Sequence, residues 1–357
     1  MNNVERIQQA LADRKLDGVL ITDEKNQRYA LGFPFTDGAV LLSRTDAWLI
    51  TDSRYVEAAA AAVAGWAEVR LYDAKRPLKD TVVHLIKKAG IKTLGLEEEK
   101  LSHAAYLRWQ QELGCKTVPA QELFDTLRAV KSDWEIGHMR HAQQISERAL
   151  METMHSIKAG VSEREIAAEL VYRMMRLGGE GVSFDPIVIF GAKTSMPHGV
   201  PGDEILSPGS FITIDFGCLK EGYCSDMTRT FAFGKPTEEM VNIYDTVLSA
   251  QLAGIKAAKA GITGAELDKA ARDVITAAGH GAHFGHGFGH SLGLDIHENP
   301  SARPSNHEPL PAGAVISAEP GIYIPGQFGV RIEDVLVLRQ DGCENITGFP
   351  KELIVLE

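Results

Sequence analysis

Apolar residues gather in short blocks over the first third of the chain, and turn residues separate these blocks. Short runs rich in Val, Ile and Leu between turn residues are typical of β-strands. They fall at residues 18–22, 39–43, 47–51 and 69–72. An alanine-rich stretch at residues 55–64 predicts a helix between the last two runs. The pattern therefore predicts an α/β segment.

The same alternation continues to about residue 130, where a new helix is predicted to begin. The intervening pattern predicts a helix, a strand and a helix at residues 78–89, 94–97 and 104–113. Residues 123–130 then lead to Ser132-Asp-Trp-Glu135, a capping box in which each side chain accepts a backbone N–H. A length of 357 residues also suits two domains. We predict domains at residues 1–130 and 131–357.

The second half contains an internal repeat. Residues 158–166 and 259–267 share a Lys-Ala-Gly lead-in, and each copy places Ser162 or Thr263 three residues before a glutamate. Each copy is followed by a helical run that ends in glycine. A capping box alone is common by chance, so the shared lead-in and the similar helix lengths carry the interpretation. We predict a duplicated half-domain.

Strand-like sequence follows each repeated helix. It occupies residues 187–190 and 211–217 in the first copy and residues 314–318 and 329–338 in the second. Helices grouped with such strands predict antiparallel sheet covered by helices on one face. The fold class expected for the second domain is therefore α+β.

Two aspartates in the first copy are candidates for chemistry. Asp215 interrupts the apolar run Phe-Ile-Thr-Ile-Asp-Phe-Gly, and a polar turn at residues 218–222 predicts a hairpin with residues 223–233, which contain Asp226. A buried carboxylate needs a partner, and hydrogen bonds to the backbone would suffice for one alone. Two facing carboxylates repel unless a cation or a proton lies between them.

Three further side chains extend this set. Six of the twelve histidines lie between residues 280 and 307, and glycines surround His290, which indicates close backbone approach. We interpret the outlying histidines of this group, His280, His283 and His307, as exposed residues or as partners of site residues. Glu319 and Glu333 are each embedded in apolar, strand-like sequence. Carboxylates with a single imidazole suit Mn²⁺, Co²⁺ or Zn²⁺, which predicts a dinuclear hydrolytic centre.

The amino-acid composition argues against several classes of binding partner. Hydrophobic residues make up 44% of the chain, charged residues 24%, and the net charge is -11, without a basic cluster, so a nucleic-acid partner is not expected. The four cysteines form no Cys-x-x-Cys pair, which predicts neither structural zinc nor a disulfide framework. Neither an apolar signal region nor an apolar run of ~20 residues is present. We expect a cytoplasmic protein without a membrane partner.

Four ordered segments resemble the signatures of the creatinase/aminopeptidase P/prolidase superfamily, peptidase family M24. They are Asp215-x10-Asp226, Gly289-His290-x-x-Gly293-Leu-x-x-His297-Glu, Glu319-Pro-Gly-Ile-Tyr and Gly329-Val-Arg331-Ile-Glu333-Asp. The likeness extends to Ser183-Phe-Asp185, Pro197-His198-Gly199 and Asp52-Ser-Arg-Tyr55. The resemblance implies a pita-bread catalytic domain with duplicated halves, preceded by a smaller creatinase-type α/β domain.

The resemblance also implies roles for single residues. Asp215 would bind one metal ion, Asp226 and Glu333 would bridge two, and His290 and Glu319 would bind the other. Two divalent ions are expected, Mn²⁺ or Co²⁺ in the first place and Zn²⁺ as an alternative. Glu319 would also be the proton shuttle.

Three histidines and an arginine match substrate-site positions of the family. The expected substrate-binding residues are His198, His286, His297 and Arg331, and the expected catalytic residues are His198, His297 and Glu319. A structural ion pair of Arg331 with Glu333 or Asp334 is the competing role for that arginine.

The expected activity is removal of the N-terminal residue from short peptides, preferentially at Xaa-Pro bonds, by a homodimer. A prolidase that accepts only dipeptides is the main alternative. Methionine aminopeptidase specificity is disfavoured by the N-terminal domain. A non-catalytic peptide-binding module is disfavoured by the complete ligand set.

Overall fold

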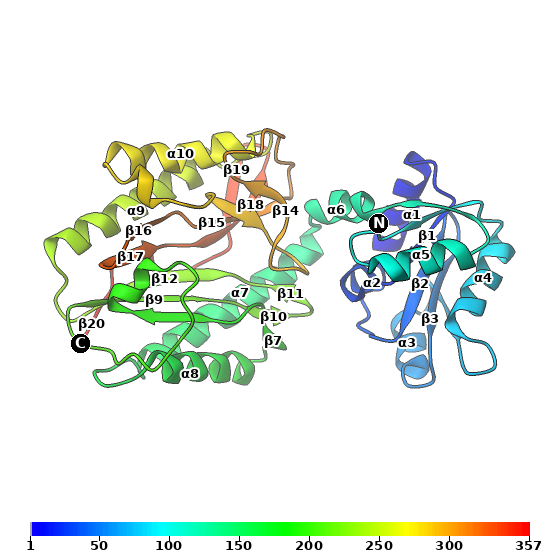
Figure 1. The fold of residues 1–357 in the computed structure, drawn as a ribbon, viewed down its shortest axis with the longest axis horizontal. Coiled ribbons are helices and arrows are strands. Elements are labelled where there is room, and N and C mark those ends of the chain that lie inside the picture. The colour runs from blue at the N-terminus through cyan, green and yellow to red at the C-terminus, as the bar shows by residue number, and fades with distance from the viewer. Residues whose placement is uncertain (1) are drawn as a thin grey trace. The chain divides into compact units, whose positions relative to one another are not determined.

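The computed structural model describes residues 2–357, which divide into two compact units between Leu127 and Arg128 (Figure 1). The predicted boundary near residue 130 lies close to this division. None of the helices within residues 2–357 combines the length and the apolar content that a membrane span requires.

The first unit is built on a six-stranded mixed sheet with strand order β4-β3-β2-β1-β5-β6. Its strands are β1 (Gly18–Ile21), β2 (Gly38–Ser43), β3 (Ala47–Thr51), β4 (Glu68–Leu71), β5 (Thr93–Leu96) and β6 (Lys116–Pro119). Its helices are α1 (Asn3–Asp13), α2 (Glu24–Leu31), α3 (Val56–Ala62), α4 (Leu78–Ala89) and α5 (His103–Glu112), and α6 (Gln121–Ala129) leads into the second unit. The predicted α/β segment is therefore confirmed.

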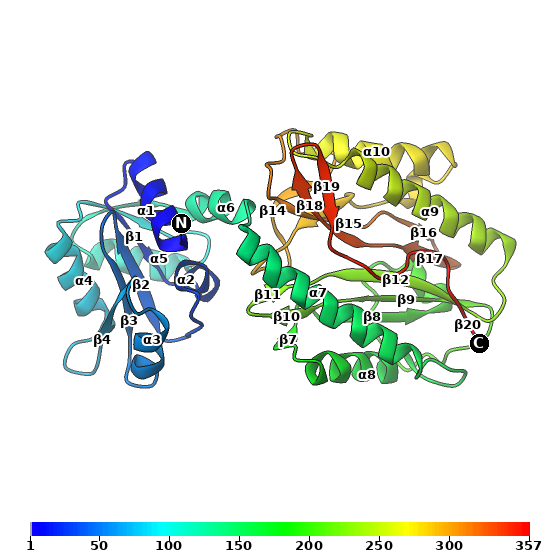
Figure 2. The same cartoon turned by 180° about the vertical axis from the view of Figure 1, so that it is seen from behind.

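The first half of the second unit contains a four-stranded sheet with strand order β20-β12-β9-β8 and a small three-stranded sheet. Its helical elements are α7 (Asp133–Met154), α8 (Glu163–Arg176) and the 3-10 turn η1 (Gly191–Ser195). Its strands are β7 (Gly181–Val182), β8 (Ile187–Phe190), β9 (Ser210–Phe216), β10 (Cys218–Lys220), β11 (Tyr223–Cys224), β12 (Met227–Phe233) and β20 (Val355–Leu356). Helices α7 and α8 lie beside the sheet that contains β8, β9 and β12 (Figure 2). Apolar residues of these helices and strands share one core.

The second half contains a five-stranded sheet with strand order β14-β13-β15-β18-β19 and the pair β16-β17. Its helical elements are α9 (Glu238–Ala257), α10 (Gly264–Ala277) and the 3-10 turn η2 (Gly281–His283). Its strands are β13 (Gly289–Ser291), β14 (Glu298–Ala302), β15 (Val315–Ala318), β16 (Gly321–Ile324), β17 (Phe328–Arg331), β18 (Asp334–Arg339) and β19 (Gly342–Asn345). Helices α9 and α10 pack against these strands in a second core.

The internal repeat is visible as two equivalent helices. Both α8 and α10 are 14 residues long, and capping boxes begin them at Ser162 and Thr263. Each capping residue also forms an isolated β-bridge, to Ile205 in the first half and to Pro309 in the second. The predicted α+β fold with duplicated halves is therefore confirmed.

Two of the predicted strands are interrupted, and each interruption carries a candidate ligand. Residues 223–233 form β11 and β12, so the prediction that Asp226 lies within a paired strand was wrong. Gly217 explains the close approach there, because a Cβ atom on it would lie 1.9 Å from the Ser225 carbonyl oxygen. Residues 329–338 form β17, which pairs with β16, and β18, which pairs with β15. Glu333 lies between these two strands and donates its backbone N–H to the Thr228 carbonyl.

Candidate metal centre

A cavity of about 580 Å³ lies in the second unit and gathers all of the site residues that the sequence predicted. These residues are His198, Asp215, Asp226, His286, His290, His297, Glu319, Arg331 and Glu333. They come from both copies of the repeat, so neither half-domain forms the site alone.

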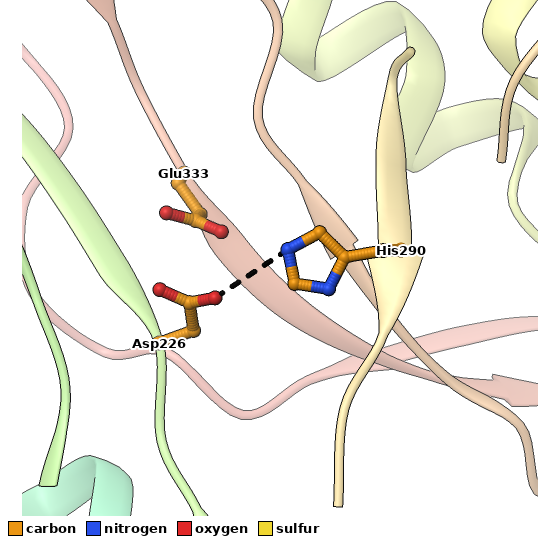
Figure 3. Close-up of side chains that lie close together, drawn as sticks. All are labelled: Asp226, His290 and Glu333. Carbon is orange, nitrogen blue, oxygen red and sulfur yellow. Dashed lines mark ion pairs between the residues drawn. The ribbon is translucent and has the colours of Figure 1, made fainter. Parts of the chain in front are cut away.

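Three of the predicted ligands form the closest group. Ligand atoms of Asp226, His290 and Glu333 all lie within 4.8 Å of one another, close enough to hold a metal ion. Figure 3 shows the imidazole of His290 pointing from β13 toward the two carboxylates, and its Nε2 lies 3.6 Å from Asp226 Oδ2. The same Nε2 lies 3.3 Å from Glu319 Oε1, which adds a fourth predicted ligand to the group.

Asp215, the fifth predicted ligand, is held from one side only. Its Oδ2 accepts from Arg331 Nη2 at 2.6 Å, whereas its Oδ1 is buried and has no hydrogen-bond partner among residues 2–357. A buried carboxylate oxygen without a partner is costly, and a cation would satisfy it. This oxygen therefore fits the metal site that the sequence predicted.

Charge repulsion inside the cavity also fits a cation. Burial raises the pKa of Asp226 well above its usual value, and the charges of Asp215 and Glu319 add to that increase. Burial and the same neighbouring carboxylates raise the pKa of Glu333 as well. Because burial and like charges disfavour ionised carboxylates, bound cations would relieve the repulsion. The donor set, oxygen atoms with one imidazole, suits divalent transition metals.

The orientation of His290 is fixed by its other ring nitrogen. His290 Nδ1 lies 3.2 Å from the Ser291 carbonyl oxygen, an acceptor, so Nδ1 carries the proton and the lone pair of Nε2 is available to a cation held between His290, Asp226 and Glu319. Burial lowers the pKa of His290, which favours the neutral imidazole that metal ions bind.

Two hydroxyl side chains orient carboxylates, and sequence reasoning missed both. Thr228 Oγ1 donates to Glu333 Oε2 at 2.8 Å, and Ser317 Oγ donates to Glu319 Oε1 at 3.0 Å. Ser317 lies two residues before Glu319 and Thr228 two residues after Asp226. Asp226 and Glu319 lie just outside β12 and β15, so the only signal in the sequence is a hydroxyl residue close to a predicted ligand.

Arg331 is buried at the centre of a hydrogen-bonded network. It donates to Asp215 Oδ2, to the Tyr323 hydroxyl at 2.8 Å and to Thr228 Oγ1 at 3.0 Å. The competing prediction that it pairs with Glu333 or Asp334 was wrong, because its ion-pair partner is Asp215. Asp334 instead forms ion pairs with Arg229 and Lys351.

His286 belongs to the same network. Its Nε2 lies 2.9 Å from the Tyr323 hydroxyl and its Nδ1 lies 2.9 Å from the Gly287 carbonyl oxygen. Burial raises the pKa of Tyr323 to about 12, so its hydroxyl stays protonated at neutral pH. Sequence reasoning missed Tyr323, although it follows Glu319 within the same motif.

His198 and His297 lie differently, because both are exposed and line the cavity. The ring of His297 lies 4.4 Å from the ring of His290, measured between centroids. Partial burial lowers the pKa of His297, and the neighbouring His290 contributes to this shift. These two imidazoles can therefore contact a bound molecule that also reaches the carboxylates.

Solved structures of similar proteins cover almost the whole chain. A protein titled Xaa-Pro dipeptidase from Bacillus anthracis is 40% identical, with 99% of each chain covered and a TM-score of 0.94. An X-Pro aminopeptidase from Thermotoga maritima is 38% identical, covering 98% of this chain and 100% of its own, with a TM-score of 0.93. A curated relative named Xaa-Pro dipeptidase from Pyrococcus horikoshii is 34% identical over 98% of both chains.

The family models match both units of the chain. Residues 3–130 match the creatinase/prolidase N-terminal domain, and residues 137–340 match metallopeptidase family M24. The cavity, with its carboxylates and His290, lies within the second matched region. The chain therefore belongs to metallopeptidase family M24.

Proposed function

We propose that this metallopeptidase removes the N-terminal residue of short peptides at Xaa-Pro bonds. The observation that carries the proposal is the convergence of four carboxylates and His290 in one cavity, with Asp215 Oδ1 left unpaired among the described residues. The preference for proline is supported by relatives named Xaa-Pro peptidases.

The predicted ligands have distinct roles in this proposal. Asp215, Asp226, His290, Glu319 and Glu333 would hold two divalent ions, with Mn²⁺ or Co²⁺ first and Zn²⁺ as an alternative. Such ions supply a water that ionises near neutral pH and a polarised scissile carbonyl. Glu319 would act as the proton shuttle, moving a proton to the departing proline nitrogen, which leaves as a secondary amine.

The exposed histidines and the buried network complete the site. His198 and His297 donate to the carbonyl oxygen as negative charge develops on it. Arg331 holds Asp215 in place, and Tyr323 orients His286 at the cavity wall. An Xaa-Pro bond has no N–H and a fixed φ, so its recognition relies on shape and on the carbonyl rather than on strand-like pairing.

A second candidate is a strict Xaa-Pro dipeptidase, and Arg303 favours it. Arg303 lines the cavity, is exposed and makes no ion pair with residues 2–357. A guanidinium in that position suits the free carboxylate of a dipeptide, because it can bind two carboxylate oxygens at once. The Bacillus anthracis and Pyrococcus horikoshii relatives carry the dipeptidase name.

A peptide panel tests both candidates. Ala-Pro, Ala-Pro amide, Ala-Pro-Ala and Met-Ala-Ser are incubated with the Mn²⁺-loaded protein. Cleavage of Ala-Pro-Ala supports the aminopeptidase, and cleavage of Ala-Pro but not of Ala-Pro-Ala supports the dipeptidase. In the second case Arg303→Gln should raise the KM for Ala-Pro roughly tenfold, about 1.4 kcal/mol, without affecting Ala-Pro amide. Cleavage of Met-Ala-Ser alone would refute the preference for proline.

The proposal includes a homodimeric assembly, which the family resemblance implies, and a cytoplasmic location. Sedimentation equilibrium of the full chain measures the assembly directly. A mass of one chain at micromolar concentration would refute the dimer.

A further inference from the structure

Four charged side chains form a cluster at the segment that joins His290 to His297, and the side chains of all but Asp295 are buried. The cluster consists of Arg128, Lys131, Asp295 and Glu298, and all four belong to the second unit. Arg128 Nη2 donates to Asp295 Oδ2 at 2.6 Å and also to Glu298 Oε1. Lys131 Nζ donates to Glu298 Oε2 at 3.0 Å. Only 4% of Lys131 and 6% of Arg128 is exposed, so these two cations are paired by the carboxylates rather than by water.

One hydrogen bond of this cluster connects it to His290 through Ser291. Lys131 Nζ donates to Ser291 Oγ at 2.9 Å, and this hydrogen bond is buried. The carbonyl oxygen of the same serine lies 3.2 Å from His290 Nδ1 and so fixes which ring nitrogen faces the carboxylates. Lys131 therefore holds the residue that orients the imidazole.

A second set of contacts fixes the chain on either side of His297. Glu298 follows it directly in the chain, and Glu298 Oε1 accepts the Asp295 backbone N–H at 3.0 Å. Gly293 shows how tightly the segment is closed, because a Cβ atom on it would lie 2.8 Å from Glu298 Oε2. The Gly293 carbonyl also accepts the Cys224 N–H at 2.7 Å, close to Asp226 in the sequence. The segment is thus tied at both of its ends.

The cluster is expected to add little to the stability of the fold. Burial opposes the ionised form of Glu298, but Lys131 and Arg128 lower the pKa of Glu298, so the cluster contains real charges. Buried ion pairs add little net stability compared with apolar side chains, because desolvation offsets their attraction. Their directional contacts instead select one conformation of the chain around them.

We propose that Lys131 and Glu298 are positioning residues that fix the chain from Ser291 to Glu298 and thereby hold His290 for metal binding. The inference rests on the proposed metal centre, yet neither residue touches the cavity's predicted ligands. Removing an outer partner of a metal-binding histidine generally weakens metal affinity or activity by about 10–100-fold. The same size of effect is expected here.

The test measures Mn²⁺ affinity by calorimetry in Lys131→Met, Ser291→Ala and the double variant. Lys131→Met should weaken Mn²⁺ binding roughly tenfold or more, and Ser291→Ala, which removes one hydroxyl and keeps the fold, should weaken it in the same direction. Because both act through one contact, the double variant should lose much less than the two single losses combined. Leu170→Ala, a buried truncation in α8, is the control for general destabilisation.

Two results separate this inference from its alternatives. If Lys131→Met and Ser291→Ala lower the melting temperature as Leu170→Ala does but bind Mn²⁺ like the wild type, the cluster is only structural and the inference fails. If the wild type binds Mn²⁺ but cleaves no Xaa-Pro peptide, the proposed function fails, while the effect of the variants on Mn²⁺ affinity still decides the inference.

Discussion

Asp226 is the residue on which the candidate centre depends most. It is buried, its ligand oxygen lies 3.6 Å from His290 Nε2, and Asp215 and Glu319 both add repulsion to its charge. Such repulsion between buried carboxylates destabilises the metal-free protein, and bound cations would remove it. Function and stability therefore make opposite demands on this side chain.

Asp226→Asn separates these two demands. The amide is nearly isosteric and carries no charge, so the chelated variant should melt at the same temperature as the chelated wild type or a few degrees above it. Addition of Mn²⁺ at 100 times its Kd should stabilise the wild type by about 2.7 kcal/mol and the variant hardly at all. Thermal melts with and without chelator measure both effects. A variant that is unfolded, or one stabilised by Mn²⁺ like the wild type, would contradict this account.

At the level of elements, the site depends on strands that end early. β12 begins one residue after Asp226, and Glu333 lies in the gap between β17 and β18. In such gaps the backbone leaves the regular pleat, and a carboxylate can turn toward the partner half-domain. At Asp226 the interruption coincides with the close approach of the Gly217 backbone to the Ser225 carbonyl oxygen.

Gly217→Ala should disrupt this close approach. Its Cβ atom would meet the Ser225 carbonyl oxygen at 1.9 Å, so the strands must separate beside Asp226. Overpacking of this kind costs about 1–3 kcal/mol or more, and Mn²⁺ affinity should fall together with stability. Urea unfolding and calorimetric titration measure the two quantities.

Gly137→Ala is the matched control for this substitution. Gly137 is exposed within α7, and a Cβ atom there meets nothing within 4 Å. Alanine should stabilise the helix by about 0.5–1 kcal/mol and leave Mn²⁺ affinity unchanged. If both glycine variants behaved alike, the close approach at Gly217 would not be what shapes the site.

The sequence predicted the elements better than their interruptions. Helix α4 and strand β3 have the predicted bounds because their apolar patterns are regular and their ends carry turn residues. The breaks at Asp226 and Glu333 were missed because both residues interrupt apolar runs that otherwise read as continuous strand. The motifs named the candidate ligands, but Tyr323 and the partner of Arg331 depend on contacts between distant segments, which periodicity does not encode.

At the scale of the whole molecule, each unit has a core of its own. Buried apolar residues cluster within the sheet and helices of the first unit, and two other clusters serve the duplicated halves of the second. The candidate ligands all belong to the second unit, and they come from both of its halves. Metal binding is therefore expected to join the two halves energetically and to leave the first unit unaffected.

Calorimetry of the full chain tests this division. We expect two thermal transitions, of which only the one belonging to the second unit moves upward when Mn²⁺ is added, because a ligand stabilises only the part that binds it. Chelation should return that transition to its original temperature. Equal upward shifts of both transitions would show that the two units do not unfold independently.

The central claim is that metal ions bound by this cavity drive cleavage at Xaa-Pro bonds. It is tested most directly by following hydrolysis of Ala-Pro and Ala-Pro-Ala while the chelated protein is titrated with Mn²⁺. We expect no cleavage without metal and a rate that rises until about two ions are bound per chain, with the bond before proline as the one cut. Undiminished cleavage after complete chelation would contradict it, as would a metal-saturated protein that cleaves neither peptide.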